Sequence, residues 1–348
     1  MVFWKIAQSS LFLITYAAVS FAQFSSQIDS GKVEFNDIKE ASGLASSKKN
    51  PGVLWAHNDT KDKKRLFAMN GNGKHLGVYY VCNAKDRDWE DIAVGPGPDS
   101  EKSYIYVGNI GDNDLEYDIK YVYRCEEPDV TTTQEGAIDT IENVDVLQFC
   151  YPDGRKNAEA LMLDPLTKDY YIITKNEKKE LVYKAAYPQP LTSVDTLECV
   201  DTLDLNEIVA GDISVDGREI IIKTYKKVYY WKRIGDETIQ ETMRRTPSTI
   251  SYIEEPQGEG LAWDLNGSGY FTISEEENSD CHLYYYARNI NNVIKFRNGQ
   301  TNSRVIGRNF RLVNTGDAPV SYLLSGRKNI PASNRTNRTM LKGVGRNY

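Results

Sequence analysis

Histidine is scarce in this chain, and the short signatures of several enzyme families are absent. Only 3 histidines and 5 cysteines occur in 348 residues, and no two cysteines have the CxxC spacing. This scarcity argues against a zinc site, whose ligands are clustered Cys and His side chains. No GxSxG nucleophile elbow, Walker loop, GxGxxG fingerprint or HExxH pair is present. The sequence therefore gives no support for an α/β-hydrolase, a nucleotide-binding enzyme or a zinc protease.

Long apolar runs are confined to the start of the chain. Residues 6–21 are mostly apolar and follow Lys5, and small residues lie around Ala22. This pattern predicts a signal peptide over residues 1–22, with cleavage after Ala22. No later stretch approaches the roughly 18 apolar residues of a membrane helix. We therefore expect a secreted, extracellular protein without a membrane span.

Secretion makes two covalent modifications relevant. In an oxidising compartment the five cysteines suit two disulfides and one spare thiol, and we predict Cys125–Cys150 as one pair. A sequon at Asn58 is expected to stay unmodified, because it lies in the predicted mouth described below. Accessible N-glycosylation sequons are predicted at Asn266, Asn334 and Asn337.

Acidic residues are almost missing from the C-terminal part of the chain. Residues 290–348 hold 11 of the 42 Lys and Arg but only one of the 49 acids, Asp317, so this part carries +10 and the rest of the chain −17. An acidic body argues against nucleic acid as a partner. The last residues are rich in Asn, Arg, Gly, Ser and Thr, which predicts a basic, disordered tail over 314–348.

Three short runs typical of strands recur five times in the same order, about 50 residues apart. The first run is small and apolar, the second is β-branched and aromatic, and the third carries an aromatic residue, with hairpin turn residues before most of the second runs. The first runs begin at Ser42, Glu90, Glu159, Asp212 and Glu259. One four-stranded blade per repeat predicts an all-β fold, a β-propeller of five or six blades over residues 23–313. Closure is predicted from residues 32–38 or 293–297, pairing into the last sheet.

The repeat also predicts where polar residues gather. The first strand of a blade is innermost and the second returns antiparallel beside it, so the start of one and the end of the other meet at the same mouth of the central channel. The second runs end at His57-Asn58-Asp59, Gly111-Asp112-Asn113, Thr174-Lys175-Asn176, Lys223-Thr224-Tyr225 and Ser274-Glu275-Glu276. Carboxylates crowded in this way raise one another's pKa unless positive charge lies among them.

Two arrangements would supply that charge. Lys175 and Lys223 could neutralise part of the ring, which would make it a structural plug. Alternatively, a hard cation could be held by carboxylate and amide oxygens, a ligand set that calcium prefers. In the second arrangement Asp59 and Asp112 join the strand-start acids as candidate calcium ligands.

Several motifs together resemble a family of exported propeller proteins without a settled function. They are Trp55-Ala56-His57-Asn58-Asp59, Asp88-Trp89-Glu90-Asp91-Ile92-Ala93, Gly108-Asn109-Ile110-Gly111-Asp112-Asn113, Gly211-Asp212-Ile213-Ser214-Val215-Asp216-Gly217 and Pro256-Gln257-Gly258-Glu259-Gly260. The strand starts are also distantly similar to phytase-like and gluconolactonase-like propellers, which hold calcium at the channel mouth. That similarity implies that Glu90, Glu159, Glu259 and Asn113 are metal ligands. Ser42 departs from it, because an acid is expected there.

Two hypotheses for function follow. The first is a non-enzymatic extracellular binding or matrix protein that holds calcium at the mouth and has an extracellular ligand or matrix component as its partner. The alternative is a calcium-dependent hydrolase of a phosphoester or lactone. In that case Asp212 or Glu275 acts as the general base beside the metal.

Overall fold

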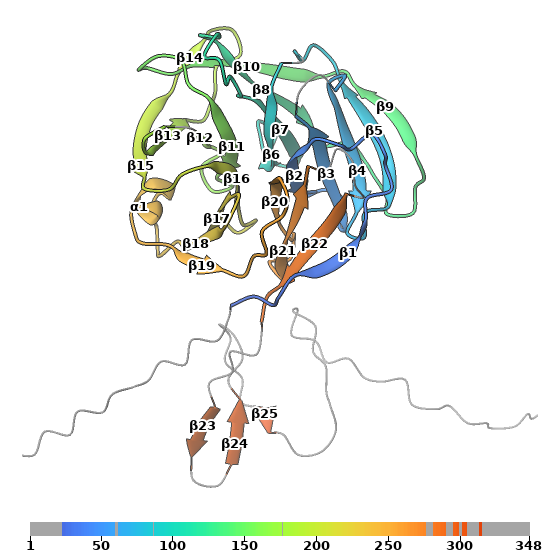
Figure 1. Cartoon of the computed structure of the whole chain (residues 1–348), viewed down its shortest axis with the longest axis vertical. Coiled ribbons are helices and arrows are strands. Elements are labelled where there is room, and N and C mark those ends of the chain that lie inside the picture. Colours follow the sequence, from blue (N-terminus) through green and yellow to red (C-terminus); the bar gives the residue numbers. More distant parts are fainter. Residues whose placement is uncertain are drawn as a thin grey trace, which may run out of the picture. The chain divides into compact units, whose positions relative to one another are not determined.

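The computed structural model describes residues 23–59, 62–85, 87–175, 177–275 and 281–289, together with the backbone of 295–298, 301–304 and 313–314. Five sheets of four antiparallel strands surround a central axis and form a five-bladed β-propeller (Figure 1). This confirms the predicted fold class, with five blades. Each innermost strand contacts the innermost strands of the two neighbouring blades, and the last contacts the first, so that the ring is closed.

Every blade uses its strands in the same order from the axis outward. The innermost strands are β2 (Ala41–Ser46), β6 (Trp89–Pro96), β11 (Ala158–Leu163), β16 (Ile208–Ile213) and β20 (Gly258–Trp263). The second strands are β3 (Val53–Asn58), β7 (Ser103–Asn109), β12 (Tyr170–Thr174), β17 (Glu219–Thr224) and β21 (Gly269–Ser274). The third strands are β4 (Arg65–Asn70), β8 (Lys120–Glu126), β13 (Glu180–Ala185), β18 (Val228–Lys232) and β22 (His282–Ala287). The fourth strands are β5 (His75–Val81), β10 (Val144–Cys150), β15 (Glu198–Leu203), β19 (Ser248–Ile250) and β1 (Ile28–Lys32).

Three further elements are added to the four-stranded blades. The longest interval between repeats contains β9 (Ala137–Ile141), which pairs in parallel with β5 and extends the first blade. A two-residue strand, β14 (Asp195–Thr196), pairs in parallel with β10. One short helix, α1 (Ile239–Met243), precedes β19 and begins with a capping box between Thr238 and Glu241.

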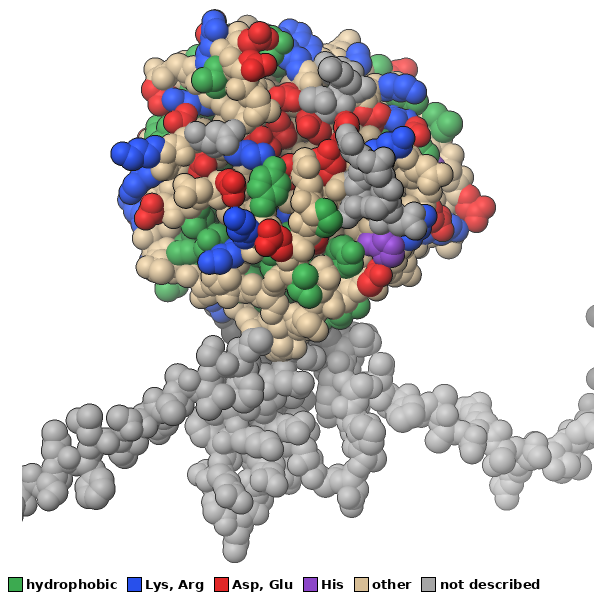
Figure 2. Space-filling view, in the orientation of Figure 1, with side chains coloured by type: hydrophobic (Ala, Val, Ile, Leu, Met, Phe, Trp, Pro, Cys, Tyr) green, Lys and Arg blue, Asp and Glu red, His purple; other side chains and the backbone are tan. Residues whose placement is uncertain are grey.

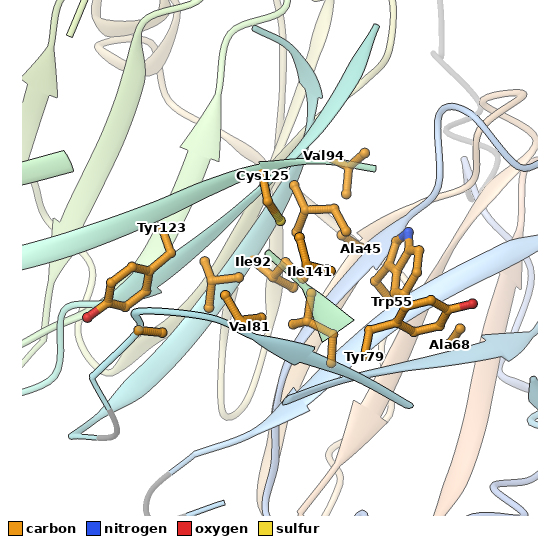
Figure 3. Packing of buried hydrophobic residues seen from close by; sticks show 14 of the residues in the cluster. Ala45, Trp55, Ala68, Tyr79, Val81, Ile92, Val94, Tyr123, Cys125 and Ile141 are labelled. Carbon is orange, nitrogen blue, oxygen red and sulfur yellow. The ribbon is translucent and has the colours of Figure 1, made fainter. Parts of the chain in front are cut away.

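The apolar core lies between the faces of adjacent blades. The innermost strands of all five blades are almost wholly buried, and large aromatic side chains fill the space farther out. Between the first two blades, Trp55 packs edge-on against Tyr79 with ring centroids 5.2 Å apart, in a cluster that also contains Ile92 and Tyr123. Figure 3 shows part of this cluster, in which side chains of β3 and β5 meet those of β6 and β8. This packing explains the high tyrosine content, because aromatic residues suit half-buried pleated surfaces.

The ring is closed by the N-terminal strand. Strand β1 pairs antiparallel with β22, so the first strand of the chain completes the last blade. Just before it, Phe24 is buried against Trp263 and Tyr270, and Arg288 stacks on its ring. The predicted closing segment, residues 32–38, therefore lies at the end of β1 and beyond it, and the second predicted segment belongs to another unit.

The chain divides into two compact units, Met1–Asn289 and Ile290–Tyr348. Within the second, β23 (Lys295–Asn298), β24 (Thr301–Arg304) and β25 (Val313–Asn314) form a small antiparallel sheet. The propeller boundary predicted at residue 313 lies within this second unit. The predicted signal peptide and the sequons at Asn334 and Asn337 lie outside the described residues. Within the part of the chain that the structure describes, no helix is long and apolar enough to cross a membrane.

The predicted Cys125–Cys150 disulfide is wrong. Strands β8 and β10 are paired so that Cys125 lies opposite Val144 and Lys120 lies opposite Phe149. Cys150 therefore lies at the other end of the ladder, on the order of 20 Å from Cys125 at about 3.3 Å per residue. A disulfide needs Cα atoms within about 7 Å. All five cysteines are free thiols in this structure.

Candidate functional site

A β-bulge opens each innermost strand at the same mouth of the channel. In all five blades the register against the second strand shifts by one residue at this point. Such a bulge re-aims a side chain locally and is common beside functional sites. The residues at the five bulges are Ser42, Glu90, Glu159, Val209 and Glu259. Four of the five predicted strand starts are therefore confirmed in position.

The fourth predicted start, Asp212, is wrong by three residues. Strand β16 begins at Ile208, and its bulge residue is Val209. Asp212 lies deeper along this strand, where its carboxylate accepts the amide hydrogens of Ile213 at 2.8 Å and Trp263 at 2.7 Å. Burial raises its pKa. Asp212 therefore ties two innermost strands together and is not an exposed base at the mouth.

The ends of the second strands meet the bulges as predicted. The residue before each bulge pairs with the last residue of the second strand, as in Ala41 with Asn58 and Ala158 with Thr174. Residues 176 and 276, two members of the predicted ring, lie outside the described residues. Figure 2 shows acidic side chains gathered near the centre of the propeller face that it draws.

Three carboxylates form the tightest acidic group in this mouth. Asp59 follows β3, Asp88 precedes β6 and Glu90 occupies its bulge, and their oxygens lie within 4.8 Å of one another. Two of them, Glu90 and Asp88, flank Gly111, where an added Cβ would lie 2.1 Å from Glu90 Oε1 and 2.4 Å from Asp88 Oδ2. Only a residue without a side chain leaves room for both carboxylates. We call Asp59, Asp88 and Glu90 the carboxylate triad.

The triad is short of hydrogen-bond donors. Among the described residues Asp59 Oδ1 is buried without a hydrogen-bond partner, and the Glu90 side chain, which is 3% exposed, has another carboxylate, Glu159, as its hydrogen-bonding neighbour. Burial, then repulsion from Asp88 and other acids, raises the pKa of Asp59 to about 8. Burial and neighbouring carboxylates also raise the pKa of Asp88 and Glu90. The cluster therefore favours a bound proton or cation.

The opposite side of the mouth carries its own positive charge. Lys175 Nζ lies 3.2 Å from Glu159 Oε2 and donates to the Tyr225 hydroxyl at 2.9 Å, and that hydroxyl donates to Glu259 Oε1 at 2.8 Å. Burial alone would lower the pKa of Lys175, but Glu159 and Tyr225 raise it above its ordinary value. Asn157 donates to the other oxygen of Glu159 at 3.2 Å. We call Glu159, Lys175, Tyr225 and Glu259 the lysine network.

The second predicted cation of the ring, Lys223, is fully buried. Its ammonium donates to the carbonyl of Gly258, lies 3.8 Å from Glu255 and stacks on Tyr252. Burial lowers its pKa to about 8, against the opposing effect of Glu255 and Glu259. The mouth therefore has a half neutralised by Lys175, as in the predicted plug, and a half where carboxylates face one another.

Two further predicted ligands have other partners. Asp112 is buried, and Lys120 Nζ lies 2.7 Å from its carboxylate, which also accepts the amide hydrogens of Glu116 and Tyr117. Burial would raise its pKa, but these three donors lower it. Asn113 is exposed, and its amide oxygen accepts a hydrogen bond from Asn157. Glu275 is half-buried at the end of β21, where the Gln257 side chain donates to it.

Sequence reasoning missed two acids. Asp88 was quoted only as part of a motif, yet it completes the triad. It stands two residues before a strand-start acid, which is the signal that could have identified it. Asp91 is fully buried, and its Oδ2 accepts amide hydrogens from Leu161 at 2.8 Å and Gly211 at 3.3 Å, on two other innermost strands. Asp91 therefore links three innermost strands, β6, β11 and β16.

The comparisons with known proteins give little beyond the geometry. No family model matches this chain, and no curated protein matches it. The resemblance to exported and calcium-holding propellers therefore stays a prediction. The chain is similar to a solved structure described as "Crystal structure of Nidogen/Laminin Complex", with 10% identity and a TM-score of 0.42, over 68% of this chain and 73% of that one.

Proposed function

We propose that this protein is a secreted, non-enzymatic binding propeller that holds calcium at its channel mouth. The observation that carries the proposal is the carboxylate triad, in which one oxygen of each of the three acidic side chains lies within 4.8 Å of the other two and, among the described residues, Asp59 Oδ1 is buried without a hydrogen-bond partner. Carboxylate oxygens are the ligands that calcium prefers, and waters can complete its coordination. A divalent cation would relieve the repulsion that raises the pKa values of these acids.

The residues present fit such a cation on one side of the mouth only. Asp59, Asp88 and Glu90 would hold it, and Asn113 lies at the rim. Glu159 and Glu259 are occupied by the lysine network, so we assign them to the structural plug and not to the first ligands of the metal. Asp112 is likewise assigned a structural role, because three donors saturate its carboxylate.

The extracellular setting rests on the predicted signal peptide and on accessible sequons. Asn266 is exposed in the turn between β20 and β21, which suits glycan attachment. Asn58 is buried, and its amide nitrogen donates to the Asp37 carbonyl at 2.7 Å and to Asp62 at 2.9 Å. A glycan there would break both bonds. We therefore propose Asn266 as a modified position and Asn58 as an unmodified one.

A calcium-dependent hydrolase is the second candidate. Of its two proposed bases, Asp212 is held by backbone amides away from the mouth. Glu275 remains, because it follows β21 at the same mouth and its charge contributes to the raised pKa of Asp59. Release of p-nitrophenol from its phosphate ester, or opening of a sugar lactone, would favour this candidate if it required calcium and was lost in Glu275→Gln.

Melting curves of Glu90→Gln and Glu159→Gln, with calcium and with chelator, test the calcium proposal. Calcium at about 100 times its Kd should stabilise the wild type by about 2.7 kcal/mol, or roughly 5 °C. Glu90→Gln should abolish this gain and melt no lower than wild type in chelator, because it relieves repulsion. Glu159→Gln should melt lower in both buffers, since it leaves the buried Lys175 without its carboxylate, at a cost of about 3 kcal/mol.

The two variants separate the triad from the lysine network. Each deletes one charge from a buried bulge glutamate and keeps its shape. The calcium site would be rejected if calcium left the melting temperature of the wild type unchanged and Glu90→Gln melted at a lower temperature than wild type in chelator.

A further inference from the structure

An acidic loop beside the mouth carries an exposed tyrosine that has no role in the candidate site. The loop connects β7 with β8, and its residues 113–118 are all exposed and belong to no strand or helix. Tyr117 is 38% exposed, whereas the other tyrosines in the described part of the chain are buried or half-buried. Exposed loop residues held by a rigid scaffold often carry function.

The Tyr117 hydroxyl has no hydrogen-bond partner among the described residues, although other groups of this residue are held in place. Its amide hydrogen is donated to the Asp112 carboxylate at 2.9 Å, and the Arg87 guanidinium stacks on its ring at 4.1 Å from the centroid. Because cation–π contacts are weak at exposed sites, the ring can leave this position. The hydroxyl is therefore accessible to a modifying enzyme in the folded protein.

Carboxylates flank Tyr117 in the sequence. Asp114 and Glu116 precede it and Asp118 follows it. All three are exposed, and only Asp118 has an ion-pair partner among the described residues, Arg155 at 2.7 Å. An exposed acidic segment of this kind is attracted to the cationic cleft of an enzyme that handles an anionic donor.

We propose that Tyr117 is a site of O-sulfation in the secretory pathway. Sulfotransferases of this pathway modify exposed tyrosines beside acidic residues, and their donor is an anionic nucleoside phosphosulfate. The phenolic oxygen attacks the sulfur atom of the donor and forms a new O–S bond. The S–O bond to the donor phosphate breaks, the nucleoside bisphosphate leaves, and the phenolic proton passes to a base of the transferase. No group is oxidised or reduced.

The inference rests on the export that the proposed function includes, because the transferase and its donor act on proteins in transit to the outside. Tyrosine kinases work chiefly in the cytosol, so export favours a sulfate over a phosphate ester. Tyr117 and the triad residue Asp88 line the same hollow of about 260 Å³. The ester would therefore add a permanent negative charge beside the mouth, and its formation requires no calcium.

Mass spectrometry of the full chain, secreted by cultured animal cells, tests this modification. We expect the tryptic peptide 103–120 to carry one additional SO₃ group, and fragmentation should locate it at Tyr117. Chlorate in the medium, which blocks synthesis of the donor, should remove the group, and alkaline phosphatase should not. Tyr104 and Tyr106 belong to the same peptide and are half-buried and buried, so they should stay unmodified. Tyr117→Phe should lose the group.

A charge-neutralising pair of variants tests the role of the acidic neighbours. Asp114→Asn with Glu116→Gln removes two charges without breaking an ion pair among the described residues, and should lower the modified fraction several-fold. Glu207→Gln with Asp236→Asn is the matched control, because it neutralises two exposed acids outside the loop and should leave the fraction unchanged. Melting curves confirm that each variant is folded.

The possible failures are distinguishable. Secreted protein with an unmodified Tyr117 would overturn this inference alone. So would a group that alkaline phosphatase removes, or a modified fraction that Asp114→Asn with Glu116→Gln leaves at the wild-type level. Protein that stays inside the cells would overturn the predicted export and this inference with it. The calcium site is judged separately, by the melting curves described above.

Discussion

At the scale of single residues, the neighbour of each mouth carboxylate decides how its charge is stabilised. Glu159 and Glu90 occupy equivalent bulges in adjacent blades and hydrogen-bond to each other, yet Glu159 also lies beside Lys175, whereas Glu90 lies beside Asp59 and Asp88. The first pairing resembles a buried ion pair, which costs several kcal/mol when one partner is removed. The second is repulsive until a proton or cation arrives. Equivalent positions in the repeat therefore have opposite electrostatic roles.

Gly111→Ala should weaken calcium binding at least tenfold without unfolding the protein. The new methyl group must displace the carboxylates of Glu90 and Asp88, whose oxygens lie 2.1 and 2.4 Å from the ideal Cβ position. Isothermal titration calorimetry should show calcium affinity reduced at least tenfold, while the melting temperature in chelator stays within a few degrees of wild type. Gly71→Ala is the matched control, because the nearest atom to its Cβ is a Phe271 ring carbon at 3.7 Å. Undiminished calcium binding in Gly111→Ala would remove the triad as the site.

At the scale of secondary-structure elements, the bulge and the antiparallel hairpin place the mouth residues. Each bulge turns one side chain of the innermost strand while the second strand returns its last residues to the same end. Closure then holds the five hairpins in a ring. The closing element is β1, and Phe24 anchors the chain just before it between Trp263 and Tyr270.

Phe24→Ala should destabilise the propeller strongly, because it empties a fully buried aromatic site at the closure. The expected loss is about 3–5 kcal/mol in the free energy of unfolding, measured by urea denaturation. Ile28→Ala on the same segment is the control, since Ile28 is 45% exposed and should cost less than about 1 kcal/mol. Equal effects of the two substitutions would mean that Phe24 does not anchor the closing strand.

At the scale of the whole molecule, the crowded mouth makes stability depend on pH when calcium is absent. The folded state raises the pKa of Asp59 to about 8 and also raises that of Asp88, Glu90 and Glu259. The unfolded chain releases these protons near pH 4. Between about pH 4 and pH 8 the native state therefore binds more protons than the unfolded state, so stability falls as the pH rises.

In chelator, the melting temperature should fall steadily between pH 5 and pH 8, and calcium should largely remove the fall. Asp59→Asn should flatten the slope by on the order of 2 kcal/mol over this window, after allowance for solvent screening of a partly exposed group. Asp236→Asn, an exposed acid elsewhere, serves as control. A stability that is level or rises from pH 5 to pH 8 in chelator would contradict the repulsive mouth. Differential scanning calorimetry in matched buffers provides the measurement.

Local patterns in the sequence were sufficient to predict the blades and most of the residues at the mouth. Alternating strands and hairpin turns depend on neighbours a few residues away, so five repeats and their common polar end could be predicted. Glu90, Glu159 and Glu259 were placed correctly for this reason. Asp212 was not, because its Gly-Asp-Ile context imitates a strand start although the strand begins at Ile208.

The partners of the mouth residues could not be predicted from the sequence, because they depend on which blades become neighbours when the ring closes. The partners of the mouth carboxylates come from other blades, as with Lys175 at Glu159 and Asp59 at Glu90, and their contacts join residues far apart in the sequence. Long-range pairing likewise decided three other features. These are the hydrogen bonds of buried Asp91, the closure through β1 and the separation of Cys125 from Cys150. Strand periodicity acts within one blade, whereas charge pairing and burial depend on which blades become neighbours. The sequence alone therefore determined a five-repeat propeller with an acidic mouth, and only the tertiary structure divided that mouth into a half paired with Lys175 and a half of crowded carboxylates.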